Sequence, residues 1–308
     1  MIKSSEELHY YEVYGLIVRS TLKLVELIEI KDISTIHKID INIDINEMTK
    51  DIKEEINNGR VRNYEKGYIW FEVKETAIYK IENGIDITIQ PYENSKIEDI
   101  KLYLLGSCLG IALLEKGKLP IHGGSIEINN NGIIFMGEKG AGKSTLTSAL
   151  RLRGYNLIAD DISVVDNKNG YKIKSGFPTQ KLCKDSLEKL GYSKADFNTL
   201  IVDDKLKYVI PVEDNFKKEE VPLKGICFLK VRDVSELSIT EVRGKDKLDT
   251  LVENIYRIEV LKALGINSKH IKEYVNLLSQ IPMYSMIRPR REFTIDRQIE
   301  LIENLFLG

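Results

Sequence analysis

The octapeptide GEKGAGKS at residues 137–144 constrains the fold more than any other part of this sequence, because it matches the pattern G-x4-G-K-[ST]. An apolar run at residues 132–136 precedes it, and residues 143–153 follow it with apolar side chains at helical spacing. A second short apolar segment, residues 156–159, comes next. The sequence therefore predicts the order strand, loop, helix, strand, which a phosphate-binding loop requires and which belongs to the α/β class.

The residue types that define this pattern each have a chemical task in holding a triphosphate. The loop turns backbone N–H groups and a helix N-terminus toward an anion, and Gly140 and Gly142 give the backbone the freedom to do so. Lys143 supplies a positive charge for the β and γ phosphates, and the Ser144 hydroxyl supplies an oxygen for Mg²⁺. We therefore expect ATP and Mg²⁺ as cofactors. The expected nucleotide-binding residues are Gly137, Gly140, Ala141, Gly142, Lys143, Ser144 and Thr145.

Paired carboxylates follow the predicted second strand. Asp160 and Asp161 lie seventeen and eighteen residues after Lys143, where an acidic group can reach the metal and the transferring phosphoryl group. In transfer to an alcohol, one carboxylate can hold Mg²⁺ while the other accepts the hydroxyl proton. The alternative is that the pair forms a turn or a helix cap, but its position after the loop favours the catalytic interpretation.

One histidine is a candidate partner for these carboxylates. His122 lies fifteen residues before Gly137, on the approach to the strand that leads into the loop. An imidazole there can orient a carboxylate base, although a structural or surface role is the alternative. We expect structural or surface roles for His9, His37 and His270.

Composition excludes several function classes. The 308 residues carry 45 Lys and Arg against 47 Asp and Glu, a formal charge of −2, which gives no electrostatic reason to expect nucleic acid or a membrane as partner. The three distant cysteines favour neither a disulfide framework nor a zinc site. We expect a cytoplasmic protein, because no signal sequence opens the chain and the apolar run Leu102–Leu114 is too short to span a bilayer. That run predicts a buried helix.

The N-terminal part is rich in predicted strands. Short β-branched and aromatic runs recur between residues 7 and 95, and Asn83-Gly84 lies between two of them as a hairpin signal. We expect a mostly antiparallel β-rich part at residues 1–95 and a kinase-like core at residues 96–308. Further predicted elements are a buried strand at 225–231, helices within 244–263 and 268–280, and a helical tail at 295–306.

Three motifs together resemble the kinase core of the HPr kinase and ATP-dependent phosphoenolpyruvate carboxykinase superfamily. They are IHGGS at residues 121–125, GEKGAGKST at 137–145 and GYNLIADD at 154–161. The resemblance implies a P-loop-containing HPr-kinase-like core, α+β overall with its β-rich N-terminal part. It implies that His122 lies beside the catalytic carboxylate, that Asp160 is the base and that Asp161 is the acid on the metal side, although the two Asp roles could be exchanged.

Within this superfamily the sequence is most similar to HPr-kinase-like proteins encoded near peptide natural-product genes of the lasso peptide type. The segment GFPTQKL at residues 176–182, followed by DSL at 185–187, resembles their signature. Some of these proteins phosphorylate a serine of a ribosomally made precursor peptide. The Pro-Gly-Arg-Asn type segment of the bifunctional HPr enzyme is absent, which argues against phosphorolysis and against HPr as the substrate.

Three hypotheses about function follow. The first is an ATP-dependent serine kinase of a protein or precursor peptide, the second an HPr(Ser) kinase of carbon regulation, and the third a non-catalytic nucleotide-binding sensor or scaffold. The family commonly forms homo-oligomers, and the β-rich part is a candidate for binding substrate or partner. Two further features are candidates for phosphate contact, with solvent-exposed charge as the alternative. They are Lys181 and the basic cluster Arg288, Arg290 and Arg291.

Overall fold

The computed structural model describes residues 7–193, 197–202, 205–212 and 214–307. The chain divides into two compact units. Unit 1 consists of Met1–Leu119 and Arg257–Ile266, and unit 2 of Pro120–Tyr256 and Asn267–Gly308. The expected boundary near residue 96 falls inside unit 1, because the helical segment that follows it packs on the N-terminal sheet.

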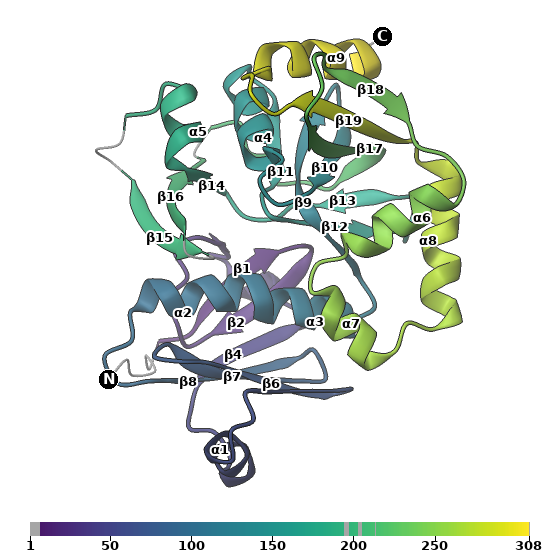
Figure 1. The fold of residues 1–308 in the computed structure, drawn as a ribbon. Coiled ribbons are helices and arrows are strands. Elements are labelled where there is room, and N and C mark those ends of the chain that lie inside the picture. Colours follow the sequence, from purple (N-terminus) through teal and green to yellow (C-terminus); the bar gives the residue numbers. More distant parts are fainter. Residues whose placement is uncertain (1–6, 194–196, 203–204, 213, 308) are drawn as a thin grey trace. The chain divides into compact units, whose positions relative to one another are not determined.

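Unit 1 is built on one large sheet (Figure 1). Over the described residues this sheet has eight strands in the order β3-β1-β2-β4-β8-β7-β6-β5. The strands are β1 (His9–Val13), β2 (Leu16–Ser20), β3 (Ile28–Glu29), β4 (Ile41–Ile45), β5 (Arg62–Glu65), β6 (Tyr68–Val73), β7 (Ala77–Glu82) and β8 (Asp86–Pro91). The pairs β2–β4 and β4–β8 are parallel and the other pairs are antiparallel, so the expectation of a mostly antiparallel part is confirmed.

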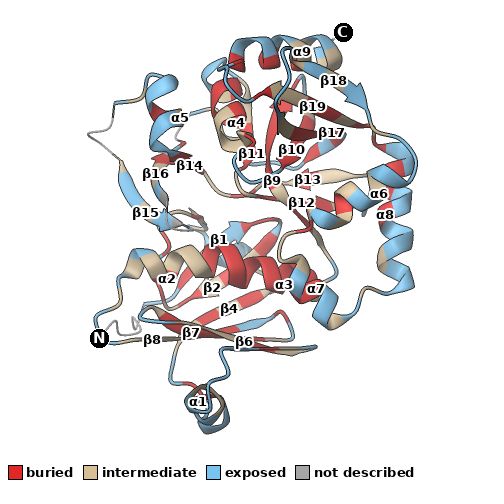
Figure 2. Cartoon of the chain, viewed as in Figure 1, coloured by how far each residue is buried: buried red, intermediate tan, exposed pale blue. Residues whose placement is uncertain are grey.

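Helices cover both faces of this sheet. They are η1 (Ile33–Thr35, a 3-10 turn), α1 (Lys50–Asn57), α2 (Ile97–Tyr103), η2 (Leu104–Cys108, a π-helical turn), α3 (Leu109–Glu115) and α7 (Ile258–Leu264). The Tyr79 hydroxyl donates to the Ile100 carbonyl at 3.1 Å, which ties β7 to α2, while Trp70 and Ile52 join the sheet to α1 on the other face. The predicted buried helix is confirmed, and Figure 2 shows α3 almost wholly buried.

The predicted hairpin is also present in unit 1. Strands β7 and β8 pair antiparallel, with Glu82 opposite Asp86. Asn83 and Gly84 between them have φ angles of 53° and 63°. Such left-handed angles suit glycine and asparagine, which explains why this dipeptide signals a turn.

Unit 2 carries the phosphate-loop motif. Its strands are β9 (Leu119–Ile128), β10 (Asn131–Gly137), β11 (Asn156–Ala159), β12 (Ile162–Asp166), β13 (Lys172–Lys174), β14 (Thr179–Cys183), β15 (Asn198–Val202), β16 (Lys205–Pro211), β17 (Val221–Arg232), β18 (Ser238–Glu241) and β19 (Met283–Pro289). Its helices are α4 (Lys143–Leu152), α5 (Lys184–Lys189), α6 (Lys245–Glu253), α8 (Ser268–Gln280) and α9 (Ile295–Leu307). Units 1 and 2 both mix helices with sheets, which confirms the α+β class.

Three parallel strands, β10, β17 and β19, fix the position of the phosphate-loop motif in the sheet. β17 pairs in parallel with β10 on one side and with β19 on the other, so their carboxyl ends lie at one edge of the sheet. The loop after β10 emerges at that edge, which is where open α/β sheets bind their ligands. A separate three-stranded sheet in the order β14-β16-β15 belongs to the same unit.

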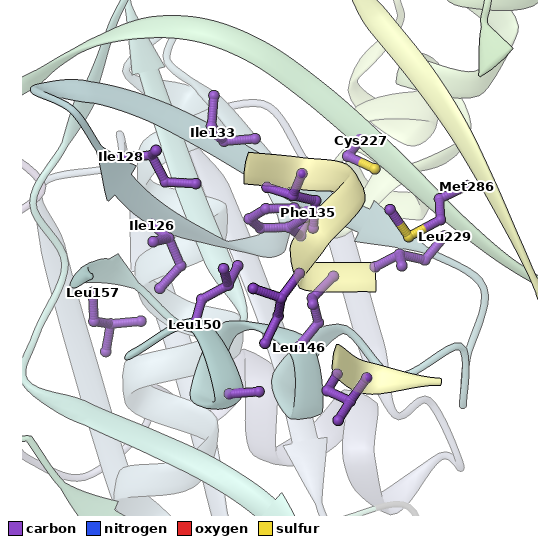
Figure 3. Close-up of a cluster of buried hydrophobic side chains, with 14 of the residues drawn as sticks. Ile126, Ile128, Ile133, Phe135, Leu146, Leu150, Leu157, Cys227, Leu229 and Met286 are labelled. Carbon is purple, nitrogen blue, oxygen red and sulfur yellow. The ribbon is translucent and has the colours of Figure 1, made fainter. Parts of the chain in front are cut away.

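The hydrophobic core of unit 2 joins this sheet to helices α4 and α9. Figure 3 shows Phe135 of β10 among side chains from the neighbouring strands, with Leu146 and Leu150 of α4 close to it. Each of these three side chains is completely buried, and burying one such side chain contributes about 1.5–3 kcal/mol. The core therefore fixes the axis of α4 against β10, and with it the loop between them.

The C-terminal expectations are confirmed with one difference. The tail forms α9, residues 268–280 form α8 and the strand at 225–231 lies within β17. The stretch 244–263, within which one helix was expected, holds α6 and all but the last residue of α7, and Arg257 between them has a φ of 56°. In the described part of the chain, no helix has both the length and the apolar character needed to span a membrane.

Candidate active site

Glycines make the phosphate-binding loop possible for two different reasons. A Cβ at Gly137 would collide with the backbone carbonyl of Leu229 in the adjacent strand β17, so the loop can leave the sheet only from a glycine. Gly142, the residue before α4, has a φ of 101°, which L side chains rarely adopt. The loop therefore ends with the N-terminus of α4 open toward an anion.

Lys143 lies folded over this loop. Its Nζ donates to the Gly137 carbonyl at 2.8 Å, so the side chain runs back along the loop it follows. Burial lowers the pKa of Lys143, while the charge of Asp161 acts in the opposite direction. A phosphate oxygen in place of this carbonyl would give the ammonium group a negatively charged hydrogen-bond acceptor.

Two arginines from neighbouring strand ends hold the loop in place. Arg288, at the end of β19, donates from Nε to the Ala141 carbonyl at 2.9 Å and from Nη2 to the Gly140 carbonyl at 3.4 Å. Arg232, at the end of β17, forms a two-pronged ion pair with Glu138, with N–O distances of 2.9 and 2.7 Å. Arg288 is thus engaged with the loop backbone, where the sequence suggested a phosphate clamp.

The rest of the basic cluster lies outside the loop. Arg290 is exposed and its Nε donates to Asp233 at 3.3 Å, and Arg291 is exposed as well.

The Thr145 hydroxyl, an expected phosphate contact, forms a hydrogen bond of 2.7 Å with the Ser186 hydroxyl. Ser144 is half-buried in the first turn of α4.

Asp160 and Asp161 form a tight turn between β11 and β12. Asp161 has a φ of 38°, and its carbonyl accepts from the Gly123 amide at 3.0 Å, which ties the turn to β9. A left-handed angle at a non-glycine residue is strained by roughly 1–3 kcal/mol and is common at functional sites. The sequence placed the pair correctly after a strand, and the structure adds this strain.

The Asp160 carboxylate is only half satisfied. Its Oδ2 accepts from the Lys181 amide in β14 at 3.0 Å. Its Oδ1 is buried and, within the described residues, has no hydrogen-bond donor. Burial raises the pKa of Asp160 to about 6, and the neighbouring charge of Asp161 adds to the effect. A group with such a pKa can both accept and release a proton near neutral pH.

Asp161 has the opposite electrostatics. Burial opposes its ionisation, but surrounding positive charge outweighs burial and lowers the pKa of this carboxyl. The groups responsible are Lys181, His122, Lys207 and Lys143. The pair therefore contains one carboxyl that favours its charged form and one that titrates close to neutrality, which is how neighbouring acids acquire separate roles.

His122 contacts Asp161. The distance from its Nδ1 to Oδ1 of Asp161 is 3.7 Å, and its ring lies 5.7 Å from the ring of Tyr256, centroid to centroid. The resemblance placed this histidine beside the catalytic base, for which Asp160 was the first choice. The contact seen here is with Asp161, which the resemblance names as the acid on the metal side.

The donor set suits Mg²⁺ better than a fully protein-ligated metal. In the described part of the chain, no three His, Cys, Asp or Glu residues gather into a metal site. Mg²⁺ commonly takes one or two protein oxygens and completes its shell with water and substrate phosphates. The anionic Asp161 fits such an ion, with the Ser144 hydroxyl as a further oxygen near the loop.

Part of the chain that contains this site is similar to a known protein family. Residues 116–192 match the family model described as "HPr Serine kinase C-terminal domain". This segment is therefore similar to the C-terminal domain of HPr serine kinases. It contains His122, the phosphate-binding loop, both aspartates and Lys181.

Individual HPr kinase/phosphorylases are also similar to about half of the chain. An HPr kinase/phosphorylase of Bordetella avium (strain 197N) is 29% identical over 163 residues, 48% of this chain and 50% of that protein. One of Cupriavidus metallidurans (strain ATCC 43123 / DSM 2839 / NBRC 102507 / CH34) is 28% identical over 184 residues, 56% of this chain and 53% of that protein. The chain thus spans about half the length of the curated relatives it matches.

A solved structure gives a weaker likeness. The Hpr(Ser) kinase/phosphatase from Coxiella burnetii shares 13% sequence identity with this chain. The alignment covers 61% of this chain and 96% of that one, with a TM-score of 0.33, which is too low to establish a shared fold.

Sequence reasoning missed two residues of the site region, Arg232 and Lys207, which received no role. It named Arg288 as a candidate for phosphate contact, and the structure shows this side chain bonded to the loop backbone. The end of a predicted buried strand signals Arg232, since residues there lie at the ligand edge of a sheet. Lys207 lies in a strand that the sequence analysis did not identify, so it carried no signal.

Proposed function

We propose that the protein transfers the γ-phosphoryl group of ATP to a serine hydroxyl of a protein or peptide, with Asp160 as the general base. The observation that carries the proposal is the half-satisfied Asp160 carboxyl, whose Oδ1 is buried without a donor and whose pKa is about 6. The large majority of buried polar atoms are hydrogen-bonded, so a buried carboxylate oxygen without a donor is unusual in a structural turn or cap. An oxygen that lacks a donor is suited to receive the proton of an incoming hydroxyl.

The residues divide the chemistry among them. The loop amides and Lys143 hold the β and γ phosphates, and the Asp160 carboxylate takes the serine proton as the serine oxygen attacks phosphorus. His122 orients Asp161 through the 3.7 Å contact. Asp161 and Ser144 would hold Mg²⁺, which supplies charge neutralisation on the phosphates when it is bound.

For the acceptor we propose a ribosomally made precursor peptide, with the β-rich N-terminal part, residues 1–95, as the candidate site of substrate or partner binding. The support is the resemblance of residues 176–182 and 185–187 to the signature of peptide-modifying relatives. HPr is the second candidate, because the proteins matched are themselves named HPr kinase/phosphorylase. A homo-oligomer is part of the same proposal.

The test is mass spectrometry after incubation with ATP and Mg²⁺. A serine-containing precursor peptide, encoded beside this gene, and HPr are offered in parallel reactions. Addition of one phosphate to a serine of the peptide supports the first acceptor, and addition to HPr alone supports the second. If neither acceptor is modified while ATP still binds, the kinase proposal fails and a nucleotide-binding sensor takes its place.

A further inference from the structure

A small sheet in unit 2 brings two lysines to one face beside the paired aspartates. In the antiparallel pair β14–β16, Lys181 lies opposite Val209 and Cys183 lies opposite Lys207. Opposed residues share a face, and residues two apart along a strand share it too. Lys181 and Lys207 therefore project from the same face of this pair.

The opposite face of the sheet is anchored, which fixes this orientation. Leu182, Tyr208 and Ile210 point the other way and form a buried cluster with Leu187 of α5. If one strand of the pair shifted its register by one residue, its share of this cluster would be exposed and its lysine would turn inward. The lysine face is thus set by the burial of its reverse side.

The lysine face borders the catalytic turn. The amide of Lys181 donates to Asp160 at 3.0 Å, so β14 lies directly against that carboxylate. Lys207 is half-buried, and its charge acts on Asp160, Asp161 and Lys143.

Positively charged side chains outnumber the two carboxylates at the turn with Asp160 and Asp161. Lys143, Lys181 and Lys207 contribute three positive charges, and the two aspartates contribute at most two negative ones. The positive charge of Lys207 also helps to lower the pKa of Lys143, because like charges repel each other. A triphosphate between them would remove that repulsion, because phosphoryl oxygens carry the matching negative charge.

We propose that Lys207, supported by Lys181, contacts the transferred phosphoryl group. This inference rests on the proposed kinase activity. In the transfer step, the acceptor oxygen bonds to the γ-phosphorus as the bond from that phosphorus to the β–γ bridging oxygen breaks. The electron pair of the broken bond leaves with ADP, and the hydroxyl proton passes to Asp160. Lys207 offsets the charge on the γ-phosphoryl oxygens while this happens.

Lys207 lies outside residues 116–192, the segment matched by the family model. Its placement rests instead on the pairing of β14 with β16. The same position gives it a distinct signature: contact with the γ-phosphoryl group alone should affect ATP and spare ADP.

The experiment compares Lys207→Ala and Lys207→Arg with Lys184→Ala, which removes an exposed positive charge at the start of α5. Calorimetry measures the affinities for ADP and for the non-hydrolysable analogue AMPPNP, with Mg²⁺ present. Steady-state assays measure kcat for the acceptor and for ATP hydrolysis, and thermal melting confirms that each variant folds.

Lys207→Ala should lower kcat about a hundredfold, as removal of one transition-state donor does. It should also weaken AMPPNP about tenfold relative to ADP, with Lys207→Arg close to the wild type and Lys184→Ala unchanged. A folded Lys207→Ala with kcat and the AMPPNP to ADP preference both within twofold of the wild type would overturn the inference. If the wild type modifies no acceptor, the proposed function fails separately, and the AMPPNP to ADP preference still decides the role of Lys207.

Discussion

The loop after β10 and the turn after β11 lie in the same unit, yet their polar groups are satisfied to very different degrees. The loop is held from outside by Arg288 and Arg232, and Lys143 is bonded to its backbone. The turn keeps a buried oxygen of Asp160 without a donor and a strained φ at Asp161. A loop that binds phosphate benefits from a rigid backbone, because its N–H groups must already point at the anion. A carboxylate that accepts a proton needs a lone pair that no other donor occupies, which explains why the turn is less completely hydrogen-bonded than the loop.

Removal of the Asp160 carboxylate from the turn should have the largest effect on the rate. Asp160→Asn removes the proton acceptor while keeping the shape of the side chain, and we expect kcat to fall roughly 10²–10⁴-fold, the usual contribution of a general base. ATP binding, measured by calorimetry, should stay within a few-fold of the wild type. The exposed Asp214→Asn in the same unit is the control and should leave kcat unchanged. Loss of nucleotide binding in Asp160→Asn would instead assign this residue to the metal.

The second effect distinguishes the two aspartates. Asp161→Asn should raise the Mg²⁺ concentration for half-maximal rate roughly tenfold or more, because an anionic oxygen is lost from the proposed metal site. Chelation of Mg²⁺ should abolish transfer in the wild type. The measurement is a Mg²⁺ titration of the rate for both single variants. A shifted titration in Asp160→Asn but not in Asp161→Asn means that the two roles are exchanged.

Releasing the loop should have a smaller effect. Arg288→Ala removes two hydrogen bonds to loop carbonyls, and we expect KM for ATP to rise about tenfold, the size of a charge-assisted bond, with kcat changed less. Arg291→Ala, a neighbouring exposed arginine, should have no effect. A large fall in kcat at saturating ATP would show that Arg288 acts on the phosphoryl group and does not merely position the loop.

The smallest effect should come from the exposed side of the loop. Arg232→Gln breaks the ion pair with Glu138, but both side chains are largely exposed, 47% and 41%, and such pairs contribute little. We expect KM for ATP to change by less than about threefold and to become less dependent on salt. Steady-state kinetics at low and high ionic strength provide the check, and a tenfold rise in KM would place this pair on a par with Arg288.

Local sequence was sufficient for the parts of the fold that depend on neighbours in the chain. The hairpin at Asn83-Gly84, the helix after the loop and the end of that helix at Gly154, with a φ of 98°, all follow from short-range chemistry. The π-helical turn at Leu104–Cys108 was not predicted, because an apolar run signals burial and helix without specifying the hydrogen-bond step. The helical stretch 97–115 packs on the N-terminal sheet, a contact that sequence periodicity does not reveal.

By itself the sequence determined the phosphate-binding loop and the position of the paired aspartates after a strand, because these depend on glycine conformations and on spacings of a few residues. Only the tertiary structure decided which groups surround them. Arg288 reaches the loop across 147 positions, His122 contacts Asp161, and strand pairing puts Lys207 on the same face as Lys181. Such contacts depend on registers set by burial over the whole sheet, and no local pattern encodes them.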